Sequence, residues 1–402
     1  MQEKYVKPER EFVALMASLM AIVALTIDAI LPALSHIGLT INSTSATSNQ
    51  LLIIMIFLGL GAGQLLFGPL SDSFGRKPIV YIGFIVFGVA SLICILAHSM
   101  EVMIVGRILQ GVGLAAPRTI SISIVRDSYK GDYMARIMSF ITAVFILVPV
   151  VAPAFGKLLL DVYNWQAIFY AQLLFAFLVC IWFWRRQPET LKKEHKKKFG
   201  FAVFSNGFKE ILNHKETIGF TIISGFITGS FMVYLSASQH IFENQYHLVE
   251  EFPFIFAGLA VGVGLATLLN GTLVVRLGMR KLALIAISVF SLNSLVYVLL
   301  FWSTANPSLP IILVFMAIQF FTIGFIFGNI RAIAMEPIGH IAGIGAAITG
   351  FVSTLIAVPI ATVIGNFVDT TALPLFMGFS IFGIASFVLF ILIKRKTSLA
   401  LS

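Results

Sequence analysis

The string GPLSDSFGRKP, residues 68–78, joins two apolar segments that are each long enough to cross a bilayer. Its two glycines permit close packing and a tight turn, and Asp72 falls at the expected end of a helix. Arg76 and Lys77 place two positive charges directly before the next apolar segment. A short charged turn between two long apolar segments predicts a hairpin of membrane-spanning helices.

The composition of the whole chain supports this prediction. Of 402 residues, 58% are hydrophobic and 11% are charged, and the mean hydropathy is +0.97. A soluble domain is nearer to about half apolar and about a quarter charged. The net charge of +9 is distributed as membrane flanks rather than as a nucleic-acid-binding face. The sequence therefore predicts a membrane protein whose partner is the lipid bilayer, with no nucleic-acid partner.

Apolar segments near the spanning length of roughly 20 residues recur along the whole chain. They cover residues 12–34, 48–71, 79–98, 102–125, 137–160, 167–184, 217–238, 252–275, 281–302, 310–331, 343–368 and 374–393. Only helices or closed barrels satisfy the backbone in lipid, and these lengths fit helices. We therefore predict an all-α membrane protein with twelve transmembrane helices.

The distribution of lysine and arginine predicts the orientation of these helices. Of the 27 Lys and Arg residues, 24 lie at the two termini and at every second connection between spans, which all face the same side of the membrane. Nine of these 24 fall within 185–216. The intervening loops contain none, and Arg107, Arg118 and Lys157 lie within spans. Because cytoplasmic loops are enriched in positive charge, both termini are predicted to be cytoplasmic.

A charge run, RRQPETLKKEHKKKFG at 185–200, divides the predicted spans into six and six. Residues of the first loop recur beyond it at a constant offset of 203: Gly68, Leu70 and Gly75 match Gly271, Leu273 and Gly278. Repeated halves of this kind are the organisation of many secondary transporters, with the substrate site between them. The predicted domains are residues 1–184 and 217–402, two six-helix bundles joined by a solvated cytoplasmic linker at 185–216.

The pattern Gly-x-Leu-x-Asp-x-x-Gly-Arg-Lys resembles the signature loop of the major facilitator superfamily. The matching residues are Gly68, Leu70, Asp72, Gly75, Arg76 and Lys77. The resemblance implies that the acid and cations of this loop make a charge contact between helices that helps to set the inside-closed state. Val275 stands where Asp72 would align in the second copy, so we expect that contact only in the N-terminal half. The alternative for the loop is a plain positively charged turn.

Two further motifs narrow the resemblance. Arg107, Gln110 and Gly111 in RILQG resemble the span-four motif of proton-driven drug antiporters, and Pro149, Pro153 and Gly156 loosely resemble the Pro/Gly motif of span five. The strings TIDAILPAL, SDSFGRKP, VRDSY and GHIAG look like the Bcr/CflA subfamily of drug-resistance transporters, over residues 20–390 or so. The resemblance implies a major facilitator fold and location in a bacterial inner membrane.

Asp28 lies inside the first apolar run, where an acid costs roughly 2.5–3.5 kcal/mol or more. It is six residues before the predicted outer end of span one, and Arg107 is five residues after the outer start of span four. At ~1.5 Å per residue both lie roughly 8–9 Å below the outer boundary, so they are expected to be neighbours. Two interpretations stay open: Asp28 takes up and releases the transported proton, or the two residues form a static ion pair.

Arg118 follows Arg107 by eleven residues, on nearly the same helix face. With Lys157 these cations would make a cavity attractive to anionic or zwitterionic groups. A small residue usually stands at this position in the Bcr-like pattern, so Arg118 departs from it. The alternatives are that Arg118 binds backbone carbonyls or lipid headgroups, and that Lys157 extends to the membrane surface.

A substrate cavity should be mostly apolar with a few polar groups. The candidates are Gln50, Ser139, Thr142, Phe145, Tyr234, Gln239 and Gln319, together with Arg118. For each polar candidate, a hydrogen bond that only packs helices together is an equally good alternative.

The sequence contains no catalytic constellation, no metal-ligand spacing and no nucleotide-binding loop, so an enzyme is not predicted. The predicted function is a proton-coupled multidrug efflux antiporter that works by alternating access, as a monomer, driven by the proton gradient without a bound cofactor. Its substrates would be small amphipathic compounds. Two alternatives remain: export of one endogenous metabolite such as a siderophore, possibly anionic, or a non-transporting membrane sensor or scaffold.

Overall fold

The computed structural model describes residues 9–43, 46–192, 194, 196, 200–303 and 305–399, and all regular structure within them is helical. The first part of the chain forms α1 (Glu9–Asp28), η1 (Leu31–Ala33), α2 (Leu34–Thr40), α3 (Ala46–Asn49), α4 (Leu51–Phe74), α5 (Arg76–Ile95), α6 (Met100–Ser128), α7 (Gly131–Val162) and α8 (Trp165–Arg186). The helix α9 (Phe201–Asn213) follows. The rest forms α10 (Lys215–Gln239), η3 (His240–Gln245), α11 (Phe252–Leu277), α12 (Met279–Phe301), α13 (Leu309–Met335), η4 (Glu336–Ile341), α14 (Ala342–Gly365) and α15 (Leu373–Leu399).

Eleven helical stretches of the described chain are long and apolar enough to cross a membrane. One of them, Leu309–Gly365, is 57 residues long and comprises α13 and α14. The two helices are separated by η4, where Ile338 has a non-helical backbone conformation. The apolar segments that the sequence indicates therefore form helices, and the all-helical architecture is confirmed.

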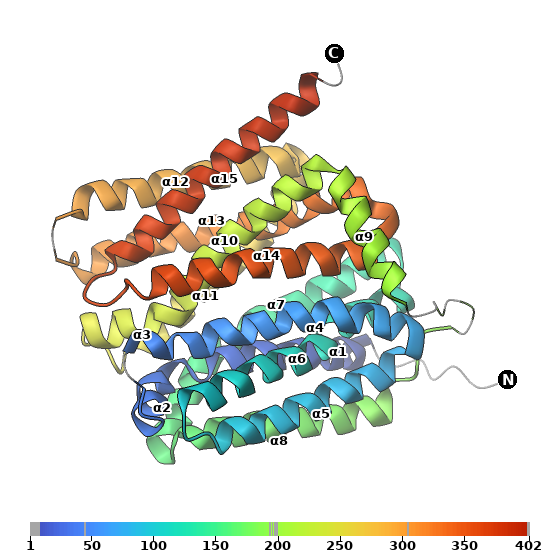
Figure 1. Cartoon of the computed structure of the whole chain (residues 1–402), viewed down its shortest axis with the longest axis horizontal. Helices are drawn as coiled ribbons and strands as arrows, with labels where there is room; N and C mark the ends of the chain where they lie inside the picture. The colour runs from blue at the N-terminus through green and yellow to red at the C-terminus, as the bar shows by residue number, and fades with distance from the viewer. Residues whose placement is uncertain are drawn as a thin grey trace.

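Helices α1–α8 lie together on one side of the molecule and α10–α15 on the other, and α9 crosses between them at one end (Figure 1). We call the two groups the N-half and the C-half. The end that carries α9 is the linker end, and the opposite end, which carries α2 and α3, is the far end. The halves pack along two helix pairs, α4 with α14 and α7 with α11.

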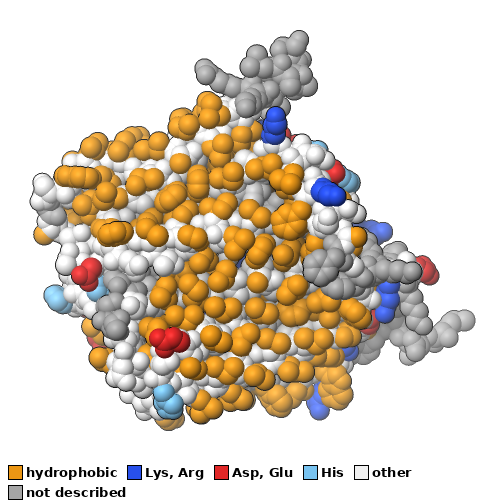
Figure 2. All heavy atoms as spheres, in the orientation of Figure 1, with side chains coloured by type: hydrophobic (Ala, Val, Ile, Leu, Met, Phe, Trp, Pro, Cys, Tyr) orange, Lys and Arg blue, Asp and Glu red, His pale blue; other side chains and the backbone are white. Residues whose placement is uncertain are grey.

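Apolar side chains cover the middle of the surface shown in Figure 2. Lys and Arg gather toward the right of that view, at the linker end, whereas acids and histidines are seen at both ends. The outer faces of the long helices carry large exposed apolar residues, among them Ile85, Leu174 and Leu299. A girdle of exposed apolar side chains between two polar ends fits a molecule that is surrounded by lipid.

The first helix ends earlier than the sequence indicates. The apolar run 12–34 predicts one continuous helix, but α1 ends at Asp28 and the chain continues through the 3₁₀ turn η1 into α2. Pro32 lies in the first turn of η1, where its missing N–H costs no hydrogen bond. This break places the Asp28 carboxyl at the end of a helix rather than in its middle.

Polar contacts close the far end. The Gln239 amide of α10 donates to Ser35 Oγ of α2 at 2.9 Å, and the Lys157 ammonium of α7 lies 3.2 Å from Glu250 Oε1. In the part of the chain that the structure describes, these are the polar contacts between the halves, and both lie at the far end. Among the described residues, the polar contacts that join the N-half and the C-half therefore lie at the far end, in addition to the packing of α4 on α14 and of α7 on α11.

Candidate functional site

Asp28 is the buried acid at the centre of the candidate site. Its side chain is 4% exposed, and within the described residues it makes no ion pair and no hydrogen bond. Helix α10 of the opposite half, which carries Tyr234, packs against η1, the turn that begins three residues after Asp28. The structure thus places Asp28 near the boundary between the halves.

Two of the cavity candidates have buried polar atoms without partners. Within the described residues, the Tyr234 hydroxyl and both amide atoms of Gln50, which lies against Gly365 of α14, make no hydrogen bond. The Tyr234 ring is enclosed by aromatic rings, with centroids 4.3 Å from Phe320 and 5.9 Å from Phe256. Buried polar groups are normally hydrogen-bonded. An apolar region with a few unsatisfied polar groups can bind a polar group of a solute or water.

Arg107 does not pair with Asp28, which differs from the expectation of a contact between them. The fully buried guanidinium donates to Leu52 O at 2.9 Å, to Thr26 O at 3.3 Å and to Gln110 Oε1 at 2.8 Å. It therefore contacts α1 only two residues before Asp28, through the backbone. The estimate that Asp28 and Arg107 lie at the same membrane depth correctly brings Arg107 to α1. It fails to predict the bonding partner, because backbone and amide oxygens already accept the hydrogen bonds of the guanidinium.

Gln110 extends this network to a third helix. Its amide donates to Ser91 Oγ of α5 at 2.8 Å, and Ser91 donates to Phe87 O. The next residue, Gly111, permits a close helix contact, since a Cβ there would lie 2.1 Å from Ile56 O of α4. The RILQG motif thus holds α1, α4 and α5 around α6.

Gly156 performs the same role between α7 and the end of α1. A Cβ at Gly156 would lie 1.8 Å from Ala29 O, the residue that follows Asp28. Pro149 and Pro153 lie inside the same helix, where each removes a backbone hydrogen bond. The span-five motif therefore sets how closely α7 approaches the carboxyl-bearing end of α1.

We expect Gly156→Ala to reduce transport by about 10-fold or more, because the added methyl forces α7 away from Ala29 and overpacking of this kind costs ~1–3 kcal/mol. Gly88→Ala in α5 is the matched control, since no atom lies within 4 Å of its Cβ position. Flux in membrane vesicles and the melting temperature in detergent measure the two effects. Equal activity of both variants would contradict the close-approach argument.

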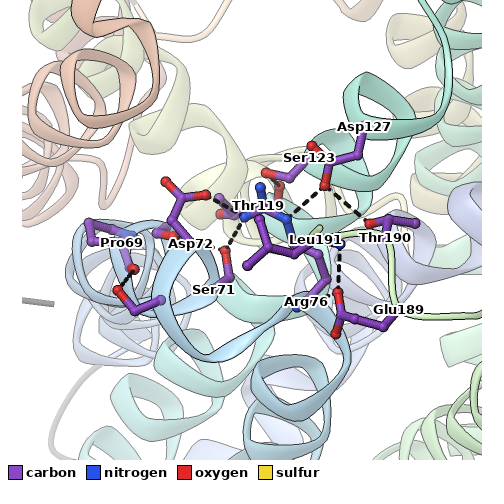
Figure 3. Close-up of polar contacts among 12 residues, drawn as sticks. Pro69, Ser71, Asp72, Arg76, Thr119, Ser123, Asp127, Glu189, Thr190 and Leu191 are labelled. Atoms are coloured by element: carbon purple, nitrogen blue, oxygen red, sulfur yellow. Dashed lines mark hydrogen bonds and ion pairs between the residues drawn. The ribbon is translucent and has the colours of Figure 1, made fainter. Parts of the chain in front are cut away.

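The loop 68–78 forms a charge network around Arg76 (Figure 3). The buried guanidinium lies 2.6 Å from Asp72 Oδ1 and 2.9 Å from Asp127 Oδ2, and it donates to Ser71 Oγ at 2.7 Å. Asp127 is the penultimate residue of α6. The expected charge contact between helices is therefore present, and it ties the α4–α5 turn to the end of α6.

Glu189 of the predicted linker binds the same turn. Its carboxylate accepts from the backbone N–H groups of Arg76 and Lys77, both at 3.0 Å, at the first residues of α5. Gly75 has φ +114°, and a Cβ there would lie 2.8 Å from Glu189 Oε2. Glycine is thus needed both for the backbone conformation and for the close approach of the Glu189 carboxylate. The positive end of the α5 helix dipole further stabilises this carboxylate.

The linker is thus not simply solvated. Thr190 donates to Asp127 Oδ2 at 3.1 Å. Farther along, α9 packs on α14. The prediction of a solvated linker over the whole of 185–216 is wrong in these places, because backbone N–H groups and carboxylates of the N-half need partners that the linker supplies.

The remaining residues of the loop pack less tightly than expected. Leu70 is partly buried against the core. No atom lies within 4 Å of a Cβ built on Gly68, so the expected close packing at this glycine is absent.

The C-half has a charge contact of its own, contrary to the expectation from Val275. Arg280 of α12 pairs with Glu216 at the start of α10 and, at 2.8 Å, with Glu336 after α13. The offset of 203 aligns Arg280 with Lys77 but finds no acid in the loop. The acids come instead from neighbouring helix ends, which a loop comparison cannot find.

The other cavity candidates have different environments. Gln319 is fully buried and bonds within the C-half, accepting from Asn293 at 2.7 Å and donating to Phe290 O, so it packs helices together. Gln239 joins the halves at the far end. Thr142 and Phe145 of α7 are partly exposed, and the side chain of Ser139 lies outside the described residues.

The other cations within the helices have different environments from one another. Lys157 bonds Asp161 at 2.9 Å as well as Glu250, so it serves a contact between the halves rather than a free positive field. Arg118 has no such partner among the described residues. Arg331, which the sequence suggests for a cytoplasmic flank, lies inside α13 instead.

The sequence analysis assigns no functional contact to three charged residues that the structure draws attention to: Asp127, Glu189 and Arg331. Each is an ordinary charge at a helix end or in a linker, so its residue type does not reveal the partner that the fold gives it. Within the described residues no group of three or more His, Cys, Asp or Glu side chains could hold a metal ion.

Comparisons with known proteins agree with this architecture. A model of the Major Facilitator Superfamily matches residues 16–361. The chain is 28% identical over 372 residues to the uncharacterised MFS-type transporter YdgK of Bacillus subtilis (strain 168), with 91% of each chain covered. It is 29% identical over 321 residues to a bicyclomycin resistance protein homolog of Haemophilus influenzae, with 79% of each covered.

A solved structure has the same fold. A peptide transporter POT in complex with sulfate superposes with a TM-score of 0.72 at 14% identity, and 99% of this chain and 96% of that chain are covered. At this identity the likeness concerns the arrangement of the helices alone.

Proposed function

The chain belongs to the major facilitator superfamily, a family of membrane transporters rather than enzymes, and from this premise we propose that it is a proton-coupled efflux antiporter for small drug-like compounds. The observation that carries the proposal is Asp28, a buried acid without an ionic partner among the described residues, next to the turn η1 on which α10 of the other half packs. An intramembrane acid of this kind is by default a functional group. The similarity to a bicyclomycin resistance protein homolog supports drug export.

The proposal includes the topology. Twelve spans arise when α13 and α14 are counted separately, as two bundles of six, residues 1–184 and 217–402, joined by 185–216. The gathering of Lys and Arg at the linker end supports a cytoplasmic location of that end and of both termini, in a bacterial inner membrane. The transporter acts as a monomer, and the proton gradient drives it without a bound cofactor.

In this mechanism the two halves rock about the site between them. The contacts Gln239–Ser35 and Lys157–Glu250 close the far end, so the described state is loaded from the linker end. Protonation of Asp28 from the far side and binding of substrate from the linker side then alternate, because the carboxyl lies at the boundary between the halves.

Flux measurements test the proposal. Purified protein in proteoliposomes that contain a pH-sensitive dye is expected to exchange internal protons for added bicyclomycin, at a rate that rises with the imposed pH gradient. Empty liposomes and a protonophore are the controls. A non-transporting sensor or scaffold would give no protein-dependent proton movement with any of a panel of neutral, cationic and anionic amphiphiles, and that result would refute transport altogether.

A further inference from the structure

A groove runs along the outer face of the N-half between α5 and α8, which pack on each other at the edge of the molecule away from the C-half (Figure 1). Its volume is about 570 Å³. The walls are mainly apolar and include Ile85 of α5 and Phe177 of α8, which are 65% and 62% exposed. Walls that are this exposed on the outer face of the N-half border lipid. The groove is therefore separate from the candidate site between the halves.

The groove spans the half of the bilayer that is nearer the linker end. On α8 its walls run from Leu173 to Trp184, which are thirteen and two residues before Arg186, the last residue of the helix. At ~1.5 Å per residue these positions are roughly 20 and 3 Å from the helix end. The apolar core of a bilayer is about 30 Å thick, so the groove has about the depth of one leaflet. One acyl chain of a lipid fits along it from the linker end.

Each wall continues into a cation at the linker end. Arg185 follows the wall residue Ile181 by four positions, and Lys77 precedes the wall residue Tyr81 by four. Residues four apart lie on one face of a helix, so both cations border the linker-end mouth of the groove. A direct contact supports this placement, because the Lys77 ammonium donates to the backbone oxygen of Trp184, another wall residue, at 3.3 Å.

Neither of these cations pairs with an acid within the described residues. The next residue, Arg186, pairs with Glu11 at 2.8 Å and is therefore already neutralised. Glu189 accepts from the backbone N–H of Lys77, at 3.0 Å, rather than from its ammonium. Arg185 is exposed and Lys77 is partly exposed, so both can bind an anion. Two cations without acids at the mouth of an apolar groove match a molecule with an anionic head and an apolar chain.

Tyr81 offers a polar group at the level between the cations and the apolar walls. Its ring packs edge-on against Phe183 with a centroid distance of 6.0 Å, and its hydroxyl has no hydrogen-bond partner among the described residues. Polar groups inside a protein are normally hydrogen-bonded, and tyrosines are enriched at the level of the membrane interface. A phospholipid has ester carbonyls between its phosphate and its chains, which supply an acceptor at this depth.

We propose that this groove is a binding site for an anionic phospholipid of the linker-end leaflet, with one acyl chain between α5 and α8 and the phosphate between Lys77 and Arg185. The inference does not depend on the proposed transport function. Guanidinium and ammonium groups both bind phosphate oxygens through charge-assisted hydrogen bonds. The phosphate joins the start of α5 to the end of α8, directly beside the charge network of Arg76.

Native mass spectrometry of the purified chain in detergent tests the inference. We expect phosphatidylglycerol to bind at an at least about 10-fold lower concentration than phosphatidylcholine with the same acyl chains, because each cation near the phosphate adds about a 5-fold preference. Lys77→Gln and Arg185→Gln should each reduce the preference about 5-fold. Arg276→Gln, at an exposed arginine in the last turn of α11 at the linker end, is the matched control. Equal binding of the two lipids, or an equal loss in all three variants, overturns the proposal.

Two checks separate a lost site from a lost fold. Lys77→Arg and Arg185→Lys keep the charges and should retain most of the preference for phosphatidylglycerol. In detergent without lipid, all of these variants should melt close to the temperature of the wild type, because the two side chains are at least partly exposed and unpaired with acids. A preference that disappears in the charge-conserving variants as well, with unchanged melting temperatures, contradicts binding through the two positive charges.

Fluorescence quenching by lipids with brominated acyl chains tests the location. Trp184 borders the groove, whereas Trp302 follows α12 at the far end, and both are 62% exposed. Each is kept as the single tryptophan of a chain in phosphatidylcholine nanodiscs, with the other tryptophans replaced by Phe. A small fraction of brominated phosphatidylglycerol should quench Trp184 and hardly affect Trp302, whereas brominated phosphatidylcholine should quench both alike. Equal quenching of both by brominated phosphatidylglycerol would assign this lipid to the general lipid shell and refute the site.

Discussion

Replacing Asp28 by Asn is expected to abolish proton-driven export at every pH while the protein still reaches the membrane. Asparagine has nearly the same size but cannot take up or release a proton. Substrate counterflow, which needs no net proton movement, is expected to continue. Proteoliposome flux with and without a pH gradient, and counterflow in the same vesicles, measure the two activities.

The stability of Asp28→Asn decides between the two interpretations that the sequence leaves open. Removing one partner of a buried ion pair costs ~3–5 kcal/mol, so a static pair with Arg107 would predict a clear loss of stability. The structure shows the Arg107 guanidinium satisfied by Leu52 O, Thr26 O and Gln110. We therefore expect an unchanged or higher melting temperature for the variant.

The control for this experiment is Glu101→Gln, an exposed acid in the first turn of α6 at the far end, which should transport normally. Undiminished pH-dependent export by Asp28→Asn would show that another group carries the proton. Loss of counterflow together with a lowered melting temperature would instead support the static ion pair.

Most of the fold can be predicted from the sequence because lipid imposes simple rules. A backbone in lipid must bond to itself, so long apolar runs become helices, and their ends are marked by glycine, proline and charge. The break after Asp28 is the exception, since Ile30, Leu31 and Ala33 are as apolar in a 3₁₀ turn as in an α-helix. Only Pro32 hints at the turn.

The sequence predicts which charged residues belong to the candidate site, but not which groups they bond to. A buried acid or cation is visible in the sequence because it is costly in lipid, which is why Asp28, Arg107 and Arg118 are found. Their partners are not, because a backbone carbonyl such as Thr26 O leaves no trace in the residue types. Arg331 was hidden by its position near a helix end, where an arginine is also typical of a plain cytoplasmic flank.

Replacing Arg76 is the second change for which we expect a large effect. Arg76→Ala removes the one group that neutralises Asp72 and Asp127 together, and it leaves both acids partly buried beside each other, with side-chain exposures of 30% and 18%. Breaking a fully buried pair costs ~3–5 kcal/mol, and this partial exposure reduces the cost to about 2–3 kcal/mol. A lower melting temperature and a large loss of transport should follow.

The chemistry of the network predicts how the neighbouring variants rank. Arg76→Lys should be nearly as impaired as Arg76→Ala, because a single ammonium cannot bond Asp127 and the Asp72–Ser71 side at once, as Nε and Nη1 do. Adding Asp127→Asn to Arg76→Ala should restore part of the stability, since it removes the excess negative charge.

Lys77→Ala is the matched control for the Arg76 variants, because its ammonium makes a single exposed bond to Trp184 O and contributes at most about 1 kcal/mol. A plain positively charged turn would make Arg76 and Lys77 equivalent, with small and similar losses. The network of Figure 3 makes them unequal: Arg76 joins the ends of α4 and α6, whereas the N–H of Lys77 is bound by Glu189 whatever its side chain. A larger drop in melting temperature for Arg76→Ala than for Lys77→Ala would show that this loop stabilises the packing of the N-half helices. Equal, small drops would show that the loop only orients the helices in the membrane.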